Sequence, residues 1–429
     1  MKSLFKKIVV AIITFEARML IARTRPHIIG ITGSVGKTST KDAVYTIIKQ
    51  KVYARKSEKS YNSEIGVPLT ILGLPNGWSN PLRWMKNIVD GAVVALFPGH
   101  YPEWLVLEIG VDRPGDIARL TSWIKPDIVI MTRLPDVPVH VEYFSSPEAV
   151  IAEKKQLVDA LRVDGIFIFN NDDAEVVKIK EGVRQPSIGF SRYSLSPFTA
   201  SADVIVYENG IPAGFEFTLT HGAEATVVAV AGSLGVHHAY NYAAAIAVGS
   251  VFGMSIQESA AALRGHLPPP GRMRLIPGIK KTLIIDDTYN ASPVAMERAV
   301  QALKEIRTYG RKIAVLGDMM ELGQYSSSEH EKAGHQVADV ADILITVGVR
   351  ARGIAEGALS MGLQESKIFQ FEDARAAGKE LEMMLEEDDV VLVKGSQSIR
   401  AERIVEEIMA HPEEASELLV RQDPMWLEI

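Results

Sequence analysis

The segment from Thr32 to Thr38 carries the clearest chemical signal in the sequence. It reads Thr-Gly-Ser-Val-Gly-Lys-Thr and begins at the last residue of the apolar run His27 to Thr32. A helix-like run from Ser39 to Gln50 follows it. Glycines let backbone N–H groups turn toward a phosphate, and a helix N-terminus adds partial positive charge. The order of strand, glycine loop and helix therefore predicts a loop that binds the phosphates of a nucleotide.

The side chains of this loop indicate how a nucleoside triphosphate and Mg²⁺ would be held. Lys37 is expected to bridge the β- and γ-phosphates, and Thr38 to bind the metal. The other residues expected at the nucleotide are Gly33, Ser34, Val35, Gly36 and Ser39. The alternative is a glycine-rich turn with an exposed lysine. Ile31 stands in place of the usual first glycine, so the match is to the shorter form of this loop, and nucleotide binding alone does not define a reaction.

Two further residues stand where they could serve a metal ion. Glu108 lies near the end of the apolar run Trp104 to Ile109, so in a parallel sheet its carboxylate would emerge at the C-terminal edge, beside the phosphate loop. A carboxylate there can bind magnesium or simply be solvated. His140 lies in the loop Arg133 to Tyr143, and taken alone it is most simply a surface histidine.

A predicted helix carries a lysine where an apolar residue is expected. The helix begins with Ser146 as N-cap and Pro147 in its first turn. Its apolar stripe is made of Val150, Ile151, Leu157, Val158 and Leu161. Helical spacing places Lys154 inside this stripe and Lys155 on the opposite, polar face. Either Lys154 has a chemical role inside the protein, or its charge snorkels from the helix edge.

The elements that must position these residues follow a regular pattern. From Arg25 onward, short apolar runs alternate with amphipathic helices, as in βαβ units around a mostly parallel sheet. The expected strands of the first part are residues 27–32, 104–109, 127–131 and 165–169. Residues 202–230 are expected to extend this sheet with antiparallel strands, and a helix from about 238 to 252 follows.

Consecutive prolines at positions 268–270 mark the clearest break, because they deny hydrogen bonds to both helix and sheet. Beyond the break, further expected strands again alternate with helices: residues 282–286, 312–316, 343–347, 367–371 and 390–393. We therefore expect an N-terminal helix at 1–24, a central domain at 25–268 and a C-terminal Rossmann-like α/β domain at 269–429.

Composition excludes several classes of function. The 429 residues have a net charge of -7, which argues against a general nucleic-acid binder because phosphate backbones require surplus lysine and arginine. The chain has no cysteine, so disulfides, thiolate zinc sites and cysteine nucleophiles are all excluded. A metal would have to be a hard ion bound by oxygen and imidazole ligands.

The N-terminus resembles the start of a signal peptide. Lys2, Lys6 and Lys7 precede the apolar run Ile8 to Ile13, but Glu16 interrupts the segment, and the run is far shorter than the roughly 20 residues needed to span a bilayer. An amphipathic helix is the better prediction. It would either pack against the body of the protein or lie on a membrane surface.

Taken in order, these motifs resemble the Mur ligase family, from the phosphate loop almost to the C-terminus. The segments that carry the resemblance are Thr32–Thr38, Asn62–Pro68, Glu108–Gly110, His140 with Lys154, His237–Asn241, Gly271–Arg272, Asp286–Pro293, Leu316–Met319 and Lys394–Ser396. The resemblance implies an α/β fold, in which a P-loop central domain with a mostly parallel sheet precedes a C-terminal Rossmann-like domain.

The resemblance also assigns roles to particular residues. It implies that Lys154 is carbamylated by CO₂ and, with Glu108 and His140, binds two magnesium ions. It implies contacts with the adenine, the γ-phosphate and the ribose from His237, Asn241, Arg272 and Asp287, although His238 replaces an asparagine of the family pattern. Substrate contacts are expected from Asn62, Ser63, Asn290 and Lys394.

The implied reaction is ATP-dependent formation of an amide bond through an acyl phosphate. The Asn62 and Asp287 segments are most similar to family members that add D-alanyl-D-alanine to a UDP-muramoyl peptide. The expected partners are therefore a carboxylate acceptor of this kind and an amino acid or dipeptide amine, with no nucleic acid. We expect a cytoplasmic monomer, and if the N-terminal helix lies on a membrane surface, its lysines would bring it to the inner face of the membrane.

The region before the phosphate loop departs from the family pattern. Family members carry a separate UDP-binding domain there, and here about two dozen residues stand in its place, so UDP would be recognised differently. A ligase for a poly-amino-acid, folate-like or lipid-linked carboxylate stays open. From other classes, a P-loop kinase and a non-catalytic nucleotide switch are the alternatives.

Overall fold

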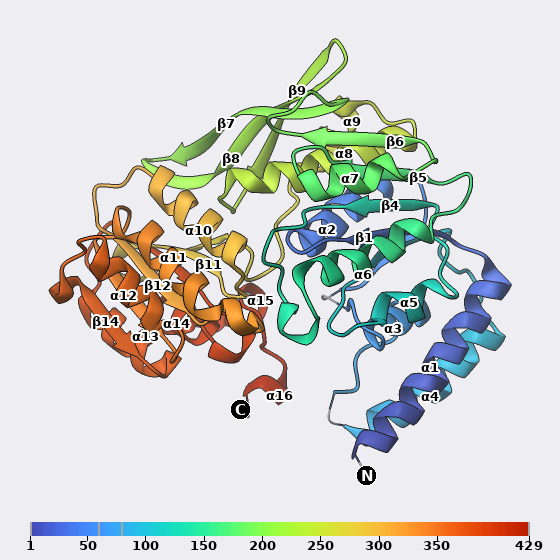
Figure 1. Cartoon of the computed structure of the whole chain (residues 1–429), viewed down its shortest axis with the longest axis horizontal. Coiled ribbons are helices and arrows are strands. Elements are labelled where there is room, and N and C mark those ends of the chain that lie inside the picture. Colours follow the sequence, from blue (N-terminus) through green and yellow to red (C-terminus); the bar gives the residue numbers. More distant parts are fainter. Residues whose placement is uncertain (1, 59–60, 79, 428–429) are drawn as a thin grey trace.

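The computed structural model describes the chain except residues 1, 59–60, 79 and 428–429 (Figure 1). The first half of the chain builds one large sheet, with the strand order β2-β3-β1-β4-β5-β6-β7-β8-β9. In chain order the strands are β1 (His27–Thr32), β2 (Ala54–Lys56), β3 (Trp104–Glu108), β4 (Ile128–Met131), β5 (Ile166–Asn170), β6 (Ser187–Ser191), β7 (Phe198–Glu208), β8 (Ile211–His221) and β9 (Glu224–Ala231).

The strands from β2 to β7 pair in parallel, and β8 and β9 extend the same sheet by antiparallel pairing. The prediction of a mostly parallel sheet with an antiparallel extension is therefore confirmed. The helices of this half are α1 (Lys2–Thr24), α2 (Lys37–Ile48), α3 (Gly66–Leu72), α4 (Pro81–Leu96), α5 (Asp116–Thr121), α6 (Pro147–Asp159), α7 (Ala174–Glu181), α8 (Ala239–Val251) and α9 (Ile256–Ala262).

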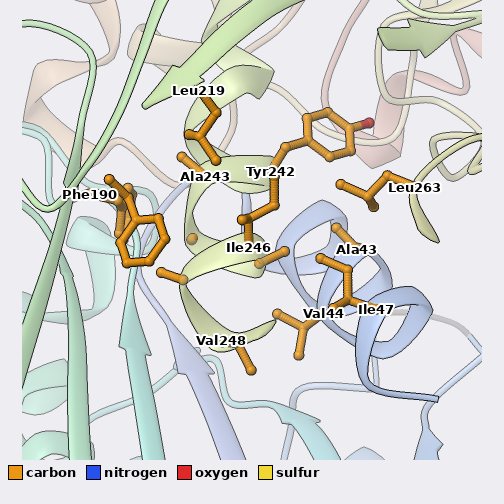
Figure 2. Packing of buried hydrophobic residues seen from close by; sticks show 14 of the residues in the cluster. Ala43, Val44, Ile47, Phe190, Leu219, Tyr242, Ala243, Ile246, Val248 and Leu263 are labelled. Atoms are coloured by element: carbon orange, nitrogen blue, oxygen red, sulfur yellow. The ribbon is translucent and has the colours of Figure 1, made fainter. Parts of the chain in front are cut away.

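Helices cover both faces of the central part of this sheet. Successive strand residues point to opposite faces, so Ile29 and Ile31 of β1 pack with α2 and α8, whereas Ile28 packs with the helices on the other face. Helix α8 is buried almost all round because its alanines let α2 approach closely. Figure 2 shows Ala43, Val44 and Ile47 of α2 beside residues of α8.

The second half of the chain builds a separate sheet in the order β10-β11-β15-β12-β13-β14, in which only the β10 and β11 pair is antiparallel. Its strands are β10 (Arg274–Pro277), β11 (Leu283–Asp287), β12 (Lys312–Gly317), β13 (Ile343–Val347), β14 (Ile368–Phe371) and β15 (Val390–Lys394). Its helices are α10 (Pro293–Glu305), α11 (Ser326–Ala338), α12 (Arg352–Ser360), α13 (Ala374–Met384), α14 (Glu402–Ile408), α15 (Ala415–Leu418) and α16 (Pro424–Leu427).

Two apolar clusters, one on each face of this second sheet, form its core. The α/β fold class with two sheets agrees with the expectation from the sequence. The segment that joins the two halves, between α9 and β10, contains the prolines at 268–270. The boundary expected at residues 268 and 269 falls in this segment and stays a prediction.

The N-terminal segment is a helix, as expected, and it packs on α3 and α4. Val9, Ile13, Ala17 and Leu20 are buried in that contact. Among the residues that the structure describes, no helix combines the length and the apolar character needed to cross a membrane. Packing against the body of the protein is thus found.

Candidate active site

The phosphate loop connects β1 to α2 at the C-terminal edge of the first sheet, as the sequence predicts. Gly33 and Gly36 adopt positive φ angles of 135° and 85°. A Cβ atom at Gly33 would collide with the Thr132 hydroxyl, and one at Gly36 would collide with the Asn241 side chain. Glycine is therefore required at both positions by the backbone angle and by the lack of space.

The loop lysine is held close to the loop itself. Lys37 Nζ donates a hydrogen bond to the carbonyl oxygen of Gly33 at 2.9 Å. Burial lowers the pKa of Lys37, and the nearby carboxylate of Glu108 opposes that shift. A cation held among backbone groups at the start of a helix is suited to an anionic ligand such as a phosphate.

The next residue meets the predicted metal carboxylate. Thr38 Oγ1 donates to Oε2 of Glu108 at 3.0 Å, and Asn62 Nδ2 lies 3.4 Å from the other carboxylate oxygen. Glu108 comes to this place because β3 pairs in parallel with β1 and ends beside it. Ser63, the residue after Asn62, accepts a hydrogen bond from the backbone N–H of Gly66.

The donors at this point fit a magnesium ion. Hydroxyl and carboxylate oxygens are hard ligands, and Mg²⁺ in nucleotide sites is bound by one or two protein groups together with phosphate oxygens and water. In the described part of the chain, no cluster of three or more histidine and acidic side chains is arranged to hold a metal. The two oxygen donors, Thr38 and Glu108, therefore fit a metal that a bound nucleotide completes.

Lys154 lies beneath the phosphate loop. Its side chain is 2% exposed, and its Nζ donates to Ser34 Oγ at 2.8 Å and to the Gly33 carbonyl oxygen at 3.2 Å. Burial, reinforced by the nearby charge of Lys37, lowers the pKa of Lys154 well below its usual value. Lys155 points outward and pairs with Asp159 at 2.5 Å. The helical register predicted for the two lysines is confirmed.

His140 is placed by a different contact. It has a positive φ of 73°, and its Nδ1 lies 2.5 Å from Oε2 of Glu321 in the second half of the chain. Its Nε2 is 3.8 Å from Asp112. The close contact with His140 lowers the pKa of Glu321. His140 thus joins the two halves in this structure, and its expected role as a metal ligand stays a prediction.

A cavity between the two halves gathers most of the residues expected at the nucleotide. Residues of the phosphate loop and residues of the second half share its walls. Of the expected residues, those that line it are Val35, Gly36, Ser39, His237, Asn241, Arg272, Asp287, Asn290 and Lys394. Arg272 stacks on the ring of Tyr289 at 3.9 Å, and its Nη2 lies 3.4 Å from Thr38 Oγ1. The second half therefore reaches the phosphate loop directly.

The two histidines at this cavity are held neutral. Burial lowers the pKa of His238 to about 4 and that of His237 well below its usual value. His238 Nδ1 lies 3.1 Å from Asn241 Nδ2, and Thr40 donates to Asn241 Oδ1 at 3.2 Å. The histidine that replaces an asparagine thus helps to orient Asn241 from within the fold.

Lys394 is not a free cation at the cavity wall. It is 1% exposed, it pairs with Asp287 at 2.5 Å, and it donates to the carbonyl oxygen of Asn290 at 3.0 Å. Asp287 and Lys394 are direct partners on the parallel strands β11 and β15. Their pairing orders the start of the loop that carries Tyr289 and Asn290.

Comparison with known proteins shows what this arrangement belongs to. Residues 31–249 match the Mur ligase middle domain, and residues 271–397 match the Mur ligase glutamate ligase domain. The chain belongs to the Mur ligase family. Both halves that share the cavity are thus domains of one enzyme family, and the expectation from the motifs is confirmed.

Curated and structural relatives agree within the family. The UDP-N-acetylmuramoyl-tripeptide--D-alanyl-D-alanine ligase of Bacillus subtilis is 28% identical, over 90% of this chain and 76% of that protein. The ligase of the same name from Mycobacterium leprae is 31% identical, over 87% of this chain and 71% of that protein. The MurF ligase of Thermotoga maritima, solved with ADP, has a TM-score of 0.73 at 26% identity and is matched over 93% of this chain and 83% of that chain.

Several cavity residues of this Mur ligase were missed by the sequence reasoning. Arg133, Asn170, Tyr240 and Arg298 also line the cavity. Burial lowers the pKa of Arg298 to about 10, and Arg133 adds to the effect. Arg133 and Asn170 could have been found, because each follows or ends a parallel strand at the ligand edge. No local pattern singles out Tyr240 or Arg298.

Arg421 is a further missed residue, close to the C-terminus. It forms an ion pair with Glu402 at 2.9 Å and donates to the carbonyl oxygens of Thr288 and Tyr289. Both charged side chains are almost completely buried. The C-terminal segment thereby fixes the loop whose Tyr289 ring supports Arg272.

Proposed function

We propose that this Mur ligase joins D-alanyl-D-alanine to the peptide of a UDP-muramoyl tripeptide, with ATP as the energy source. The observation that carries the proposal is the match, over about nine tenths of the chain, to relatives named for this reaction. The cavity geometry supports it, because the phosphate loop and the second half meet around Thr38 and Arg272.

Charge placement defines the first step. Lys37 contacts the carbonyl oxygen of Gly33 and Arg272 reaches the hydroxyl of Thr38, so both cations lie at the phosphate loop and would orient the β- and γ-phosphates of ATP. The acceptor carboxylate attacks the γ-phosphorus, a new O–P bond forms, and ADP leaves. Thr38 and Glu108 would hold Mg²⁺, which neutralises phosphate charge when it is bound. The product of this step is an acyl phosphate.

The second step forms the amide. The dipeptide amine attacks the acyl carbon, and the tetrahedral intermediate expels phosphate as the amine loses a proton. The protein contributes position and charge rather than a covalent nucleophile. We assign substrate contacts to Asn62, which lies beside the Glu108 carboxylate, to its neighbour Ser63, and to Asn290, which lines the cavity. Lys394 would serve by holding Asp287 and Asn290 in place.

We further propose that Lys154 is carbamylated. A lysine amine must be neutral to attack CO₂, and burial next to Lys37 favours the neutral form of Lys154. In the reaction the N–C bond forms and one proton leaves the nitrogen. The carbamate would present two oxygens with negative charge beside the phosphate loop, where a hard cation is expected. His140 and Glu108 would complete the set of metal ligands.

The remaining assignments concern the nucleotide and the setting of the enzyme. Asn241 and His237 would contact the adenine, and Asp287 the ribose, because all three line the cavity. A monomer in the cytoplasm, where ATP is available, suffices for the proposed chemistry. The question of how UDP is recognised arises only for a UDP-linked acceptor. The identity of the carboxylate acceptor should therefore be determined first.

The test is phosphate release from ATP and Mg²⁺ with a panel of carboxylates, each with and without D-alanyl-D-alanine, and mass analysis of the product. UDP-muramoyl tripeptide should release phosphate only when the dipeptide is present. The product should be heavier than the UDP-muramoyl tripeptide by the mass of two alanine residues. The Lys37→Ala protein is the matched control and should release none. Phosphate transfer without amide formation would indicate a kinase, and turnover without an amine would indicate a nucleotide switch.

The same panel separates the other ligase readings. Turnover with a poly-amino-acid, folate-like or lipid-linked acceptor, and none with the UDP-linked one, would overturn the proposed acceptor and keep the ligase chemistry. A kinase is disfavoured because Arg272 and Asp287 of a second α/β domain line the nucleotide cavity.

A further inference from the structure

The outer surface of helix α4 is apolar although it faces solvent. Leu82, Met85, Val89, Val93 and Leu96 recur every three or four residues, so they form one stripe along the helix. All five are exposed, Leu82 by 76%. The opposite face of α4 is buried through Trp84, Asn87, Gly91 and Ala95. The stripe therefore takes no part in the core.

Helix α1 lies beside α4 and carries a second stripe of the same kind (Figure 1). Ile8, Ile12, Phe15 and Met19 share one side of α1, and Phe15 is 67% exposed. This side adjoins the core-facing stripe of Val9, Ile13, Ala17 and Leu20. The helix is apolar on two adjoining sides. On the second side Met19 is partly packed against the core, whereas Ile8 and Phe15 are 50% and 67% exposed, so much of this side faces solvent.

Positive charge borders these stripes. Lys7 and Arg18 are exposed and lie on one line of α1, three turns apart, next to the apolar side. Lys6 on α1 and Arg83 on α4 are exposed as well. The acidic residue of α1, Glu16, is buried against Gly91 of α4 and adds no negative charge to the surface. In sequence, α1 holds five lysines and arginines against this single glutamate, although the whole chain has a net charge of -7.

We propose that the apolar stripes of α1 and α4, with their basic border, form a docking face for an anionic lipid bilayer. Helices that lie in the membrane interface combine an exposed apolar side with flanking lysines and arginines, and these attract anionic headgroups. The proposal goes beyond the N-terminal helix expected from the sequence, because α4 supplies much of the apolar surface. It does not depend on which carboxylate the ligase uses.

The charges favour a bilayer over a second copy of the chain. In a symmetric dimer the same patch meets itself, so Lys6, Lys7 and Arg18 of one copy would face the same cations of the other. Like charges brought together in this way oppose association, whereas an anionic surface attracts them. The exposed stripe and its border thus fit a lipid surface of opposite charge.

The test measures flotation of the intact chain with vesicles of phosphatidylcholine alone and of phosphatidylcholine mixed with phosphatidylglycerol. We expect binding to the anionic vesicles, weaker binding at high salt, and little binding to the neutral vesicles. The variant Leu82→Glu/Val89→Glu should lose at least about tenfold in binding, because both side chains are exposed and would enter the interface. Lys6→Glu/Lys7→Glu should lose a similar factor.

Leu195→Glu is the matched control, since Leu195 is 98% exposed on another part of the molecule, and it should bind like the parent chain. Absence of binding to anionic vesicles, or a Leu82→Glu/Val89→Glu protein that binds normally, would overturn the proposal. Concentration-dependent dimers lost in that variant would overturn it in favour of a second copy. Phosphate release without vesicles should be equal in parent and variant, so a failed docking face is distinguishable from a failed ligase assignment.

Discussion

Two buried lysines, one in each half of the molecule, meet opposite electrostatic surroundings. Lys394 of the second half lies against the carboxylate of Asp287 at 2.5 Å. Lys154 of the first half donates to a hydroxyl and a carbonyl oxygen and has the cation Lys37 nearby. Burial is nearly complete for both. The partner, rather than burial alone, therefore sets the electrostatic surroundings of a buried amine: Lys394 faces a carboxylate, whereas the cation beside Lys154 adds to the lowering of its pKa.

The largest expected effect is on activity at Lys154. We expect Lys154→Ala to lower kcat by a factor on the order of 10⁴, as removal of one member of a cooperating catalytic set does. Lys155→Ala should be nearly normal because Lys155 faces solvent. Turnover assays of the two purified proteins check this, and an active Lys154→Ala enzyme would remove the proposed role.

Two further experiments distinguish a carbamylated Lys154 from an unmodified one. A short carboxylic acid at high concentration should partly restore the Lys154→Ala enzyme, because its carboxylate can occupy the place of the carbamate. The Lys37→Ala enzyme is the control and should not respond. Rigorous removal of CO₂ and bicarbonate should lower parent activity reversibly. If neither treatment changes turnover, Lys154 acts as an unmodified amine.

The next effect is on stability, where the two lysines should behave in opposite ways. Lys394→Met leaves Asp287 buried without its cation, and we expect a loss of about 3–5 kcal/mol in the free energy of unfolding. Lys154→Met removes a buried amine that donates to the Ser34 hydroxyl and the Gly33 carbonyl oxygen rather than to a carboxylate, so stability should stay the same or rise.

Denaturant unfolding of the two proteins measures both changes. The double variant Lys394→Met/Asp287→Asn removes the orphaned charge and should recover part of the loss. Equal destabilisation by the two methionine variants would contradict the contrast between the lysines.

Glu16 extends the comparison to a buried acid that forms no ion pair with the residues that the structure describes. Burial raises the pKa of Glu16 from its ordinary value of 4.5 to about 7, and its Oε2 lacks a hydrogen-bond partner. The folded state then binds the proton more tightly than the unfolded state, so stability is highest below pH 4.5 in this respect and falls as pH rises toward and through 7. The whole effect should not exceed about 3.5 kcal/mol.

Glu16→Gln should flatten this dependence and stabilise the protein at pH 8. Thermal unfolding of parent and variant at pH 5 and pH 8 measures the difference. Asp90, which is partly exposed and paired with Lys86, offers a control: Asp90→Asn should leave the pH dependence in place. A variant that keeps the parent's slope between the two pH values would show that Glu16 is hydrated.

The smallest expected effect concerns the N-cap of α6, the helix that carries Lys154. Ser146 caps α6 by accepting a hydrogen bond from the Ala149 amide at 3.3 Å. Ser146→Ala should cost about 1 kcal/mol of stability and leave turnover within about twofold, because α6 stays packed through Val150 and Leu157. A large loss of kcat would mean that the cap also sets the position of Lys154.

Local patterns were enough to predict several parts of the fold and site. The glycine loop, the N-cap at Ser146 and the inward register of Lys154 follow from residues within one strand, loop or helix. Spacing along a single element determines which side chains share a face, so neighbouring residues contain the information. Glu108 was predictable in the same way, since it ends a parallel strand.

Contacts between distant segments were not predictable from such patterns. Lys394 resembles a free substrate-binding cation in sequence, and only the pairing of β15 with β11 places it beside Asp287. His140 likewise meets Glu321 from the other half, and the C-terminal Arg421 meets the loop at Thr288. In none of these pairs does the sequence around one residue indicate which distant residue it contacts.

The sequence by itself determined the family, the nucleotide loop and the inward direction of Lys154, because the motifs are contiguous and helix and strand periods are fixed by backbone geometry. Only the tertiary structure decided that Lys394 is paired, that Lys154 lies beside Lys37 and donates to Gly33 and Ser34, and that α4 keeps an apolar side exposed. Burial and charge state depend on what the rest of the chain brings to each side chain, and strand order and helix packing set those distances.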